Sequence, residues 1–314
     1  MERLPGAVAT QEGAKAGLKG VMALSVQRHC VKNLNGFQIL RRLAQSDTAE
    51  IFHVVRLVGR GRGGAYAAKV LREEYARDRI ERKHLETEHR ICSGLDHPNL
   101  IHVHELQLDH DRPYIVMDLV PEGRSLRQML DRGRPPLGAS LRWLAAVADG
   151  LAYLHEAGYI HRDIKPQNIC ISGDGERVKV IDFALARQQD GSFGRYLLRR
   201  LSERRRPGTW SYMAPEQIRN KRLTGAADIY ALGVTLFEVV AGRLPFTAES
   251  PQGLLEQHLY APIPLTSPDG EGVLPEVDSV IRSMMAKDPL DRPADMRYVS
   301  AKLQSAAAAC RARM

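Results

Sequence analysis

Short apolar segments follow one another from Phe37 onward, and turn-forming residues separate them. The segments FQILRRLAQ (37–45), EIFHVVRLV (50–58) and AYAAKVL (65–71) predict a meander of three strands. The charged stretch 78–95, DRIERKHLETEHRICSGL, carries Ile80, Leu85 and Ile91 and predicts a surface-lying helix. The segments LIHVHEL and PYIVMDLV then predict two further strands.

After PEGRS (121–125) the apolar residues recur at three- and four-residue steps almost to the end, which predicts helices. The sequence therefore predicts an α+β fold with a small antiparallel-sheet lobe carrying one helix and a larger, mainly helical lobe. We place the sheet lobe at residues 37–117, the connection at 118–123 and the helical lobe at 124–303. A mobile tail (1–36) and an alanine-rich helical tail (304–314) would flank them.

Composition narrows the function only slightly. The 314 residues are 44% hydrophobic and 26% charged, as in ordinary globular proteins, and the net charge of +8 favours anionic partners without choosing among them. No apolar run is long enough for a transmembrane segment. The four scattered cysteines indicate neither a zinc site nor a disulfide framework, so we expect a reducing, cytoplasmic location; they are Cys30, Cys92, Cys170 and Cys310.

The clearest chemical signal is YIHRDIKPQNICI (159–171), flanked by strand-forming residues. Asp163 lies two residues before Lys165 and five before Asn168, which matches the pattern H-R-D-x-x-x-x-N. Downstream, VKVIDFALAR supplies Asp182 and GTWSYMAPE ends in Ala-Pro-Glu. Upstream, AYAAK supplies Lys69 on a predicted strand.

With these motifs in this order, the chain resembles the eukaryotic-like (Hanks-type) serine/threonine protein kinase family from residue 37 to about 303. The resemblance implies a kinase-like bilobal fold and Mg²⁺-dependent transfer of the ATP γ-phosphoryl group to protein Ser/Thr hydroxyls. Asp163 would accept the proton of the substrate hydroxyl, and Lys165 would contact the γ-phosphate. Asn168 and Asp182 would hold Mg²⁺ through hard oxygen ligands.

The resemblance also implies a nucleotide site. Lys69 would contact the α- and β-phosphates, and Glu88 would fix the Lys69 ammonium group through an ion pair. The other residues that would contact ATP are Ala44, Ser46, Ala49, Ile51, Ala67, Met117, Asp118, Val120 and Cys170.

Further positions resemble structural residues of the family. Glu216 would form a buried ion pair with Arg292, and Asp228 would anchor the backbone of the catalytic loop. Four side chains would stack into a column that joins the lobes, namely Cys92, Val103, His161 and Phe183.

A glycine-rich stretch before Lys69 matches a phosphate-binding motif without fitting its geometry. In VGRGRGGAYAAK (58–69), Gly59, Gly61 and Gly64 spell G-x-G-x-x-G. The family places that loop between its first two strands and the lysine on the third, but only five residues separate Gly64 from Lys69. No strand fits between them. We therefore predict that GRGRGG is the turn between the second and third strands.

The phosphate loop is then LAQSDTAEI (43–51), in which Ala44, Ser46 and Ala49 stand at the three glycine positions. These replacements keep every backbone N–H but remove the freedom of φ that glycine gives. Ala184 likewise replaces the glycine of Asp-Phe-Gly, which is acceptable where φ is negative.

Seven arginines lie between Arg187 and Arg206, in the predicted activation segment. They predict either an exposed basic loop or a docking surface for an acidic or phosphorylated protein substrate or an anionic membrane. Ser192 and Ser202 are candidate phosphorylation sites there.

Two other functions compete with an active kinase. One is a pseudokinase-like scaffold or allosteric module that binds nucleotide weakly or not at all, because its loop lacks glycine. The other is a nucleic-acid-binding protein. Because that hypothesis rests only on net charge and one arginine-rich loop, nucleic acid is not expected as the main partner. The sequence does not indicate the oligomeric state.

Overall fold

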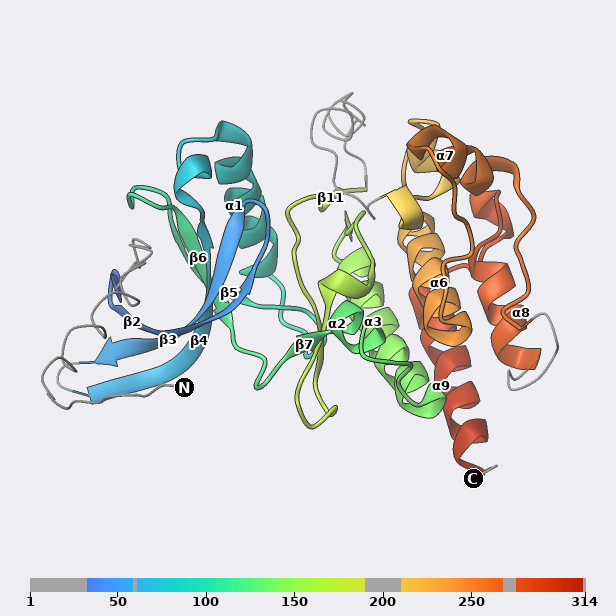
Figure 1. Cartoon of the computed structure of the whole chain (residues 1–314), viewed down its shortest axis with the longest axis horizontal. Coiled ribbons are helices and arrows are strands. Elements are labelled where there is room, and N and C mark those ends of the chain that lie inside the picture. The colour runs from blue at the N-terminus through green and yellow to red at the C-terminus, as the bar shows by residue number, and fades with distance from the viewer. Residues whose placement is uncertain (1–32, 59–60, 190–209, 268–274, 313–314) are drawn as a thin grey trace, which may run out of the picture.

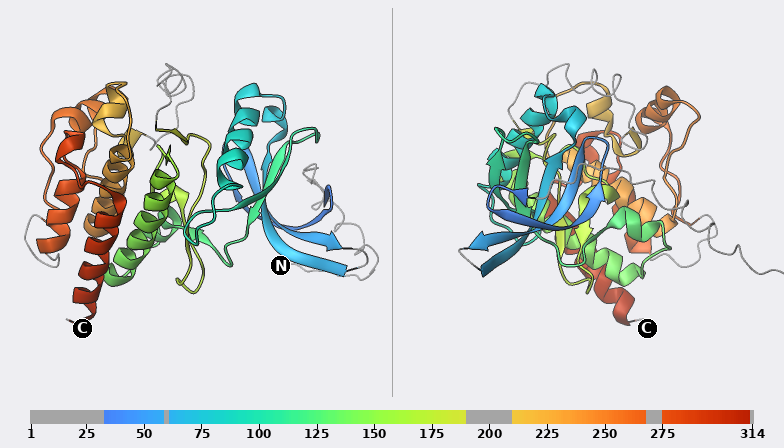
Figure 2. Two further views of the ribbon diagram at one scale, coloured as in Figure 1. Left: turned by 180° about the vertical axis from the view of Figure 1, so that it is seen from behind. Right: turned by 60° about the vertical axis from the view of Figure 1, so that its left-hand side comes forward.

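The computed structural model describes residues 33–58, 61–189, 210–267 and 275–312, which fold into two lobes (Figure 1). One lobe is a twisted sheet with helix α1 (Arg79–Cys92), and the other is mainly helical. The view from behind shows the same arrangement (Figure 2). The predicted α+β, two-lobed fold is therefore confirmed. Most of the predicted tail 1–36 lies outside the described residues.

Six antiparallel strands form the sheet of the smaller lobe. In spatial order they are β1 (Asn33–Leu34), β2 (Phe37–Gln45), β3 (Ala49–Val58), β4 (Gly61–Leu71), β6 (Tyr114–Asp118) and β5 (Val103–Gln107). The sheet thus begins at Asn33 rather than at the predicted Phe37. Leu34 and Phe37 are buried together in a small core on one face of the sheet, which holds β1 against β2.

The glycine-rich stretch falls where β3 is followed by its neighbour β4, at the predicted place in the sheet. Val58 pairs with Gly61 and Leu57 with Arg62, and residues 59–60 lie outside the described ones. The prediction that all of GRGRGG is a turn is wrong for its last four residues, because Gly61–Gly64 already belongs to β4. The whole of strand β3 separates this stretch from the loop that joins β2 to β3.

Helix α1 covers the sheet through its contacts with β5 and β6. Asp78 caps its first turn by accepting hydrogen bonds from the N–H groups of Ile80 and Glu81. Leu85 and Ile91 are buried, whereas Ile80 is half-buried. Residues 119–123 connect the lobes, between β6 and β7 (Arg124–Ser125).

The larger lobe is built around α6 (Ala226–Ala241), which is buried on nearly every side. Around it lie α2 (Leu126–Leu130), α3 (Leu137–Glu156), α5 (Pro215–Ile218), α7 (Pro251–Tyr260), α8 (Pro275–Met284) and α9 (Met296–Ala312). Helix α9 packs along α3 and contains most of the predicted helical tail. Among the described residues, no helix combines the length and the apolar character needed to cross a bilayer.

A buried ion pair joins two distant segments of this lobe, as predicted. Arg292 Nη1 and Nη2 lie 2.7 and 2.8 Å from the two carboxylate oxygens of Glu216. The guanidinium also donates to the carbonyl oxygens of Ala226 and Ala286. Since both charges are buried and fully hydrogen-bonded, the loss of either partner leaves the other without compensation.

We expect Glu216→Ala to lower the free energy of unfolding by about 3–5 kcal/mol, because it strands the buried Arg292 guanidinium. Urea unfolding measures the change. The control is Glu156→Ala, which removes an exposed pair with Arg297 and should leave the unfolding midpoint almost unchanged. Equal midpoints for wild type and Glu216→Ala would contradict the stabilising role of this pair.

Candidate active site

The segment between β8 (Tyr159–Ile160) and β9 (Ile169–Ile171) brings the three predicted catalytic residues together. Lys165 Nζ lies 2.9 and 2.8 Å from the two carboxylate oxygens of Asp163. Asn168 Nδ2 donates to the Asp163 carbonyl oxygen (2.8 Å) and to Asp163 Oδ2 (3.0 Å). Two neighbours on the same loop thus hold the Asp163 carboxylate in one orientation.

Asp228 on α6 fixes the backbone of this loop, which confirms its predicted structural role. Its two carboxylate oxygens accept the N–H groups of His161 at 2.9 Å and Arg162 at 2.8 Å. Arg162 has φ of 72°, a left-handed conformation that costs a residue other than glycine roughly 1–3 kcal/mol. The buried hydrogen bonds to Asp228 hold Arg162 in this conformation.

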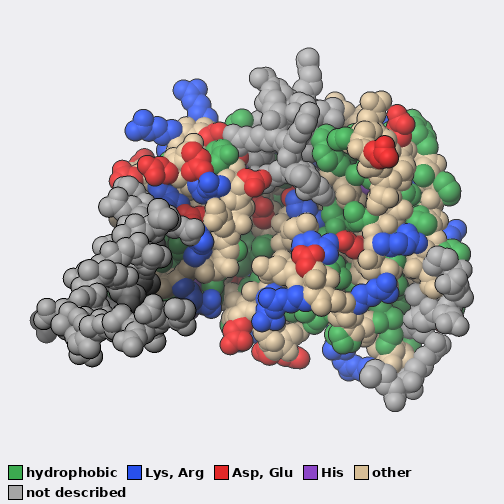
Figure 3. Space-filling model, viewed as in Figure 1, with side chains coloured by type: hydrophobic (Ala, Val, Ile, Leu, Met, Phe, Trp, Pro, Cys, Tyr) green, Lys and Arg blue, Asp and Glu red, His purple; other side chains and the backbone are tan. Residues whose placement is uncertain are grey.

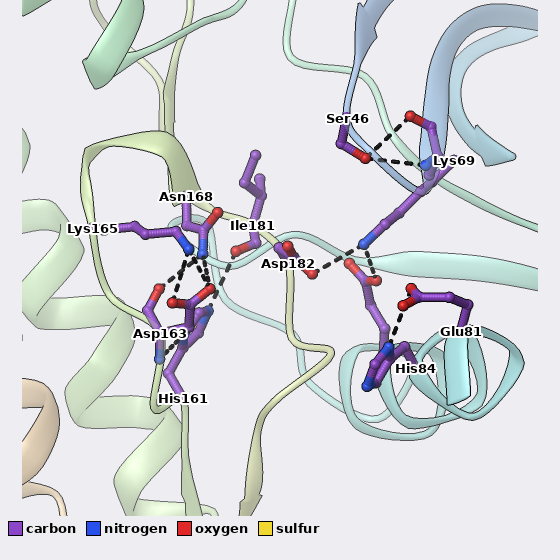
Figure 4. Close-up of polar contacts among 12 residues, drawn as sticks. Ser46, Lys69, Glu81, His84, His161, Asp163, Lys165, Asn168, Ile181 and Asp182 are labelled. Carbon is purple, nitrogen blue, oxygen red and sulfur yellow. Dashed lines mark hydrogen bonds and ion pairs between the residues drawn. The ribbon is translucent and has the colours of Figure 1, made fainter. Parts of the chain in front are cut away.

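Lys69 on β4 joins carboxylates from two other parts of the chain. Its Nζ lies 2.7 Å from Glu88 Oε2 on α1 and 3.0 Å from Asp182 Oδ1, so the predicted Lys69–Glu88 pair is present (Figure 4). Burial opposes the charge of Lys69, but Asp182 and Glu88 outweigh it and raise the lysine pKa. Burial likewise opposes the charge of Asp182, yet Lys69 lowers the pKa of this carboxyl. Both groups are therefore charged at neutral pH.

Asp182 lies between the Lys69 contacts and the Asp163 cluster (Figure 4). Its backbone is left-handed, with φ of 66°. Ala184 is not among the described non-glycine residues with positive φ, so alanine is compatible with the backbone there. Replacing the glycine of Asp-Phe-Gly thus introduces no left-handed alanine.

The predicted column beneath Asp182 is buried. The rings of His161 and Phe183 meet edge to face with centroids 4.7 Å apart. Cys92, Val103 and Phe183 belong to one continuous hydrophobic core. Burial lowers the pKa of His161, which favours its neutral ring at physiological pH.

One face of the sheet carries most of the predicted nucleotide contacts. Residues directly opposite each other in antiparallel strands point to the same face. Ile51 is opposite both Ala44 and Lys69, and Ala67 is opposite Met117. Since alternate residues share a face, this side of the sheet holds Ala44, Ala49, Ile51, Ala67, Lys69 and Met117. Ser46 lies in the loop between β2 and β3.

Asp118 does not point its side chain to that face. It pairs with Tyr66, and its carboxylate contacts His104 Nε2 at 2.9 Å and Lys179 Nζ at 3.0 Å. Asp118, His104, Lys179 and Arg177 line a cavity of about 310 Å³ behind the connection between the lobes. Only the backbone of Asp118 therefore remains available to an adenine ring. Val120 lies two residues after Asp118, in the connection between the lobes. The carbonyl oxygen of Val120 accepts the N–H of Gly123.

Cys170 on β9 lies against the connection from the other side. A Cβ atom at Gly123 would come within 2.8 Å of Cys170 Sγ, so glycine is needed for this close approach. Burial raises the pKa of Cys170 to about 11. The thiol therefore behaves as a small apolar side chain rather than as a nucleophile.

Comparison with known proteins identifies the family. Residues 49–303 match the protein kinase domain. The chain belongs to the protein kinase family. It is 36% identical over 246 residues to the serine/threonine-protein kinase PknL of Mycobacterium tuberculosis, covering 77% of this chain and 59% of PknL. It is 32% identical over 278 residues to PrkC of Bacillus subtilis, covering 88% of this chain and 41% of PrkC. The chain thus spans less than two thirds of either relative.

Protein kinases use ATP and Mg²⁺, and the oxygen atoms of this site fit such a metal. Asn168 makes both contacts with Asp163 through its amide nitrogen, which directs its amide oxygen elsewhere. Asp182 engages Lys69 through one carboxylate oxygen, Oδ1. Mg²⁺ prefers hard oxygen ligands and is commonly held by one or two carboxylates together with substrate phosphates. Asn168 and Asp182 would therefore hold it.

Sequence reasoning missed two residues that support this kinase site. His155 Nε2 lies 2.8 Å from Asp228 Oδ2 and supports the anchor of the catalytic loop. Gly123 makes room for Cys170. The glycine of PEGRS was the only available signal for the latter, whereas nothing in YLHEAG singled out the histidine. The candidate phosphorylation sites Ser192 and Ser202 lie outside the described residues.

We expect Cys170 to react with iodoacetamide at pH 7.4 roughly a few hundred times more slowly than a free thiol of pKa about 8.5, because burial suppresses its thiolate. The rate should rise with pH up to about 11 and fall when Mg-ATP covers the site. Peptide mapping by mass spectrometry isolates this residue, and a cysteine in an unstructured model peptide is the reference thiol. Modification at the reference rate would contradict the raised pKa of this partly buried thiol.

Proposed function

We propose that this chain is a serine/threonine protein kinase that transfers the γ-phosphoryl group of Mg-ATP to protein hydroxyls. The observation that carries the proposal is the meeting of two charged clusters. Lys69 contacts Glu88 and Asp182 on one side, and Asp163 contacts Lys165 and Asn168 on the other (Figure 4). Phosphoryl transfer depends mainly on positioning and on neutralising charge, which these groups supply.

Each group has a distinct task in this proposal. Asp163 accepts the proton of the substrate hydroxyl and orients its oxygen for attack on the γ-phosphorus. Lys165, 2.8 Å from Asp163, neutralises charge that develops on the transferred group. Lys69 binds the phosphates that remain with the nucleotide, while Glu88 fixes its position. Mg²⁺, when bound, would neutralise negative charge on the phosphates.

The alternative is a pseudokinase-like scaffold, and it rests on the missing glycines. All six polar groups are retained, which favours an active enzyme over a scaffold. A phosphoryl-transfer assay separates the two hypotheses, because a scaffold transfers no phosphate.

We further propose an acidic or phosphorylated protein as the substrate. The sequence argument lies in the arginine-rich segment, of which only Arg187–Gln189 is described. The described residues add one argument. Arg127 Nη1 and Tyr212 Oη both lie 2.5 Å from the buried carboxylate of Glu238, and Arg127 belongs to α2, which packs against the turn 166–168 of the catalytic loop. A basic substrate side chain would have to compete with Arg127 for this carboxylate.

Surface charge is consistent with this substrate class. Basic side chains are more prominent than acidic ones over the middle of the face shown in Figure 3.

We also retain a cytoplasmic location in the proposal. The described cysteines, Cys92, Cys170 and Cys310, are all free thiols, as is usual in a reducing compartment.

We expect purified wild-type protein with Mg-ATP to phosphorylate itself or a generic protein substrate, and Asp163→Asn to lower the rate at least about 100-fold by removing the proton acceptor. Lys69→Met should abolish transfer as well, because it removes the phosphate contact. Incorporation of ³²P measures the rates. Asp109→Asn and Lys83→Met, which alter exposed residues of the same types, serve as controls.

Equally low incorporation by wild type and both variants would reject the kinase proposal. Nucleotide binding is then read separately by thermal unfolding. Mg-ATP at a hundred times its dissociation constant stabilises a protein by about 2.7 kcal/mol. A shift without transfer would indicate a nucleotide-binding scaffold, and no shift at millimolar Mg-ATP would remove the nucleotide site as well.

A further inference from the structure

The loop between β2 and β3 closes tightly although it contains no glycine. The N–H of Ser46 donates to the carbonyl oxygen of Ala49 at 2.8 Å. The N–H of Ala49 donates to Ser46 Oγ at 3.1 Å, and the same hydroxyl donates to the Ala49 carbonyl oxygen at 3.1 Å. Both backbone groups of Ala49 are therefore hydrogen-bonded to Ser46 (Figure 4).

The backbone of this loop does not require glycine. The described residues other than glycine with positive φ are Glu122, Arg162, Asp182 and Asn220, and none of them lies in the loop. Alanine and serine therefore occupy positions 44, 46 and 49 without left-handed strain. The hydrogen bonds of Ser46 supply the closure.

A second set of contacts ties the loop to the strand that carries Lys69. The N–H of Arg72 donates to the Thr48 carbonyl oxygen at 2.9 Å, and Arg72 Nη1 donates to the Asp47 carbonyl oxygen at 3.0 Å. Thr48 is buried, and Ala49 lies directly opposite Leu71. The tip of the loop is thus fixed two to three residues beyond Lys69, next to the proposed phosphate site.

We propose that Ser46 is a positioning residue for the nucleotide, whose hydroxyl closes the phosphate loop before ATP binds. This inference rests on the proposed nucleotide site at Lys69 and Asp182. A flexible glycine loop loses backbone freedom when it closes over its ligand, and this loss weakens binding. In this chain Ser46 orders the loop in advance, so less freedom is lost when the nucleotide enters.

The test compares Ser46→Ala, Ser46→Gly and Ser46→Thr. One lost hydrogen bond of about 1 kcal/mol corresponds to roughly a five-fold change in binding. We expect Ser46→Ala and Ser46→Gly to raise the Kd of Mg-ADP, measured by calorimetry, and the KM for ATP by about this factor, with kcat little changed. Ser46→Thr retains the hydroxyl and should restore both constants. Ser46→Gly is the sharpest variant, since it restores the glycine of the family pattern.

Tighter or unchanged Mg-ADP binding by Ser46→Gly would overturn the inference, as would failure of Ser46→Thr to restore binding. Ser305→Ala, on the exposed side of α9, is the matched control. Thermal unfolding without nucleotide shows that each variant is folded. If wild type itself does not bind Mg-ADP, the proposed nucleotide site fails; if it binds and the Ser46 variants bind equally well, only the role of Ser46 fails.

Discussion

The position of one partly buried ammonium group, that of Lys69, determines how the rest of the site is assembled. It lies within 3.0 Å of carboxylates from α1 and from the segment that follows β10 (Val178–Val180), so it joins the sheet, the helix and the helical lobe. Burial makes each of these charges unfavourable alone, and their mutual contact offsets part of that cost. The placement of α1 against the sheet and the left-handed backbone of Asp182 are both coupled to this contact.

A comparable constraint holds the catalytic loop in the helical lobe. Asp228 lies on α6, the most buried helix, and orders two consecutive N–H groups and the His155 ring. The strained backbone of Arg162 persists because a fully buried carboxylate has no better partner than these donors. The orientation of Asp163 therefore depends on a residue 65 positions later in the chain.

The sequence predicted what is encoded locally. The period of apolar residues located the strands of the sheet and most long helices, and motif spacing located Asp163, Asn168 and Asp182. It did not predict α7, or the strand at Asn33, which depends on burial of Leu34 beside Phe37. Nor did it show that the side chain of Asp118 turns toward His104 and Lys179, because that choice depends on partners far away in the chain.

The glycines show why a motif must be judged by geometry. A glycine is required where φ is positive or where another atom occupies the space of a Cβ, as at Gly123 beside Cys170. No residue of the loop 44–49 has positive φ, and Ser46 supplies the hydrogen bonds that close the loop. The absence of glycine therefore changes the loop backbone less than the sequence pattern suggests. The stretch at 59–64 has the full glycine pattern, but its described residues belong to the β3–β4 pair, away from the proposed phosphate loop. The proposed nucleotide site therefore depends on where this loop lies relative to Lys69.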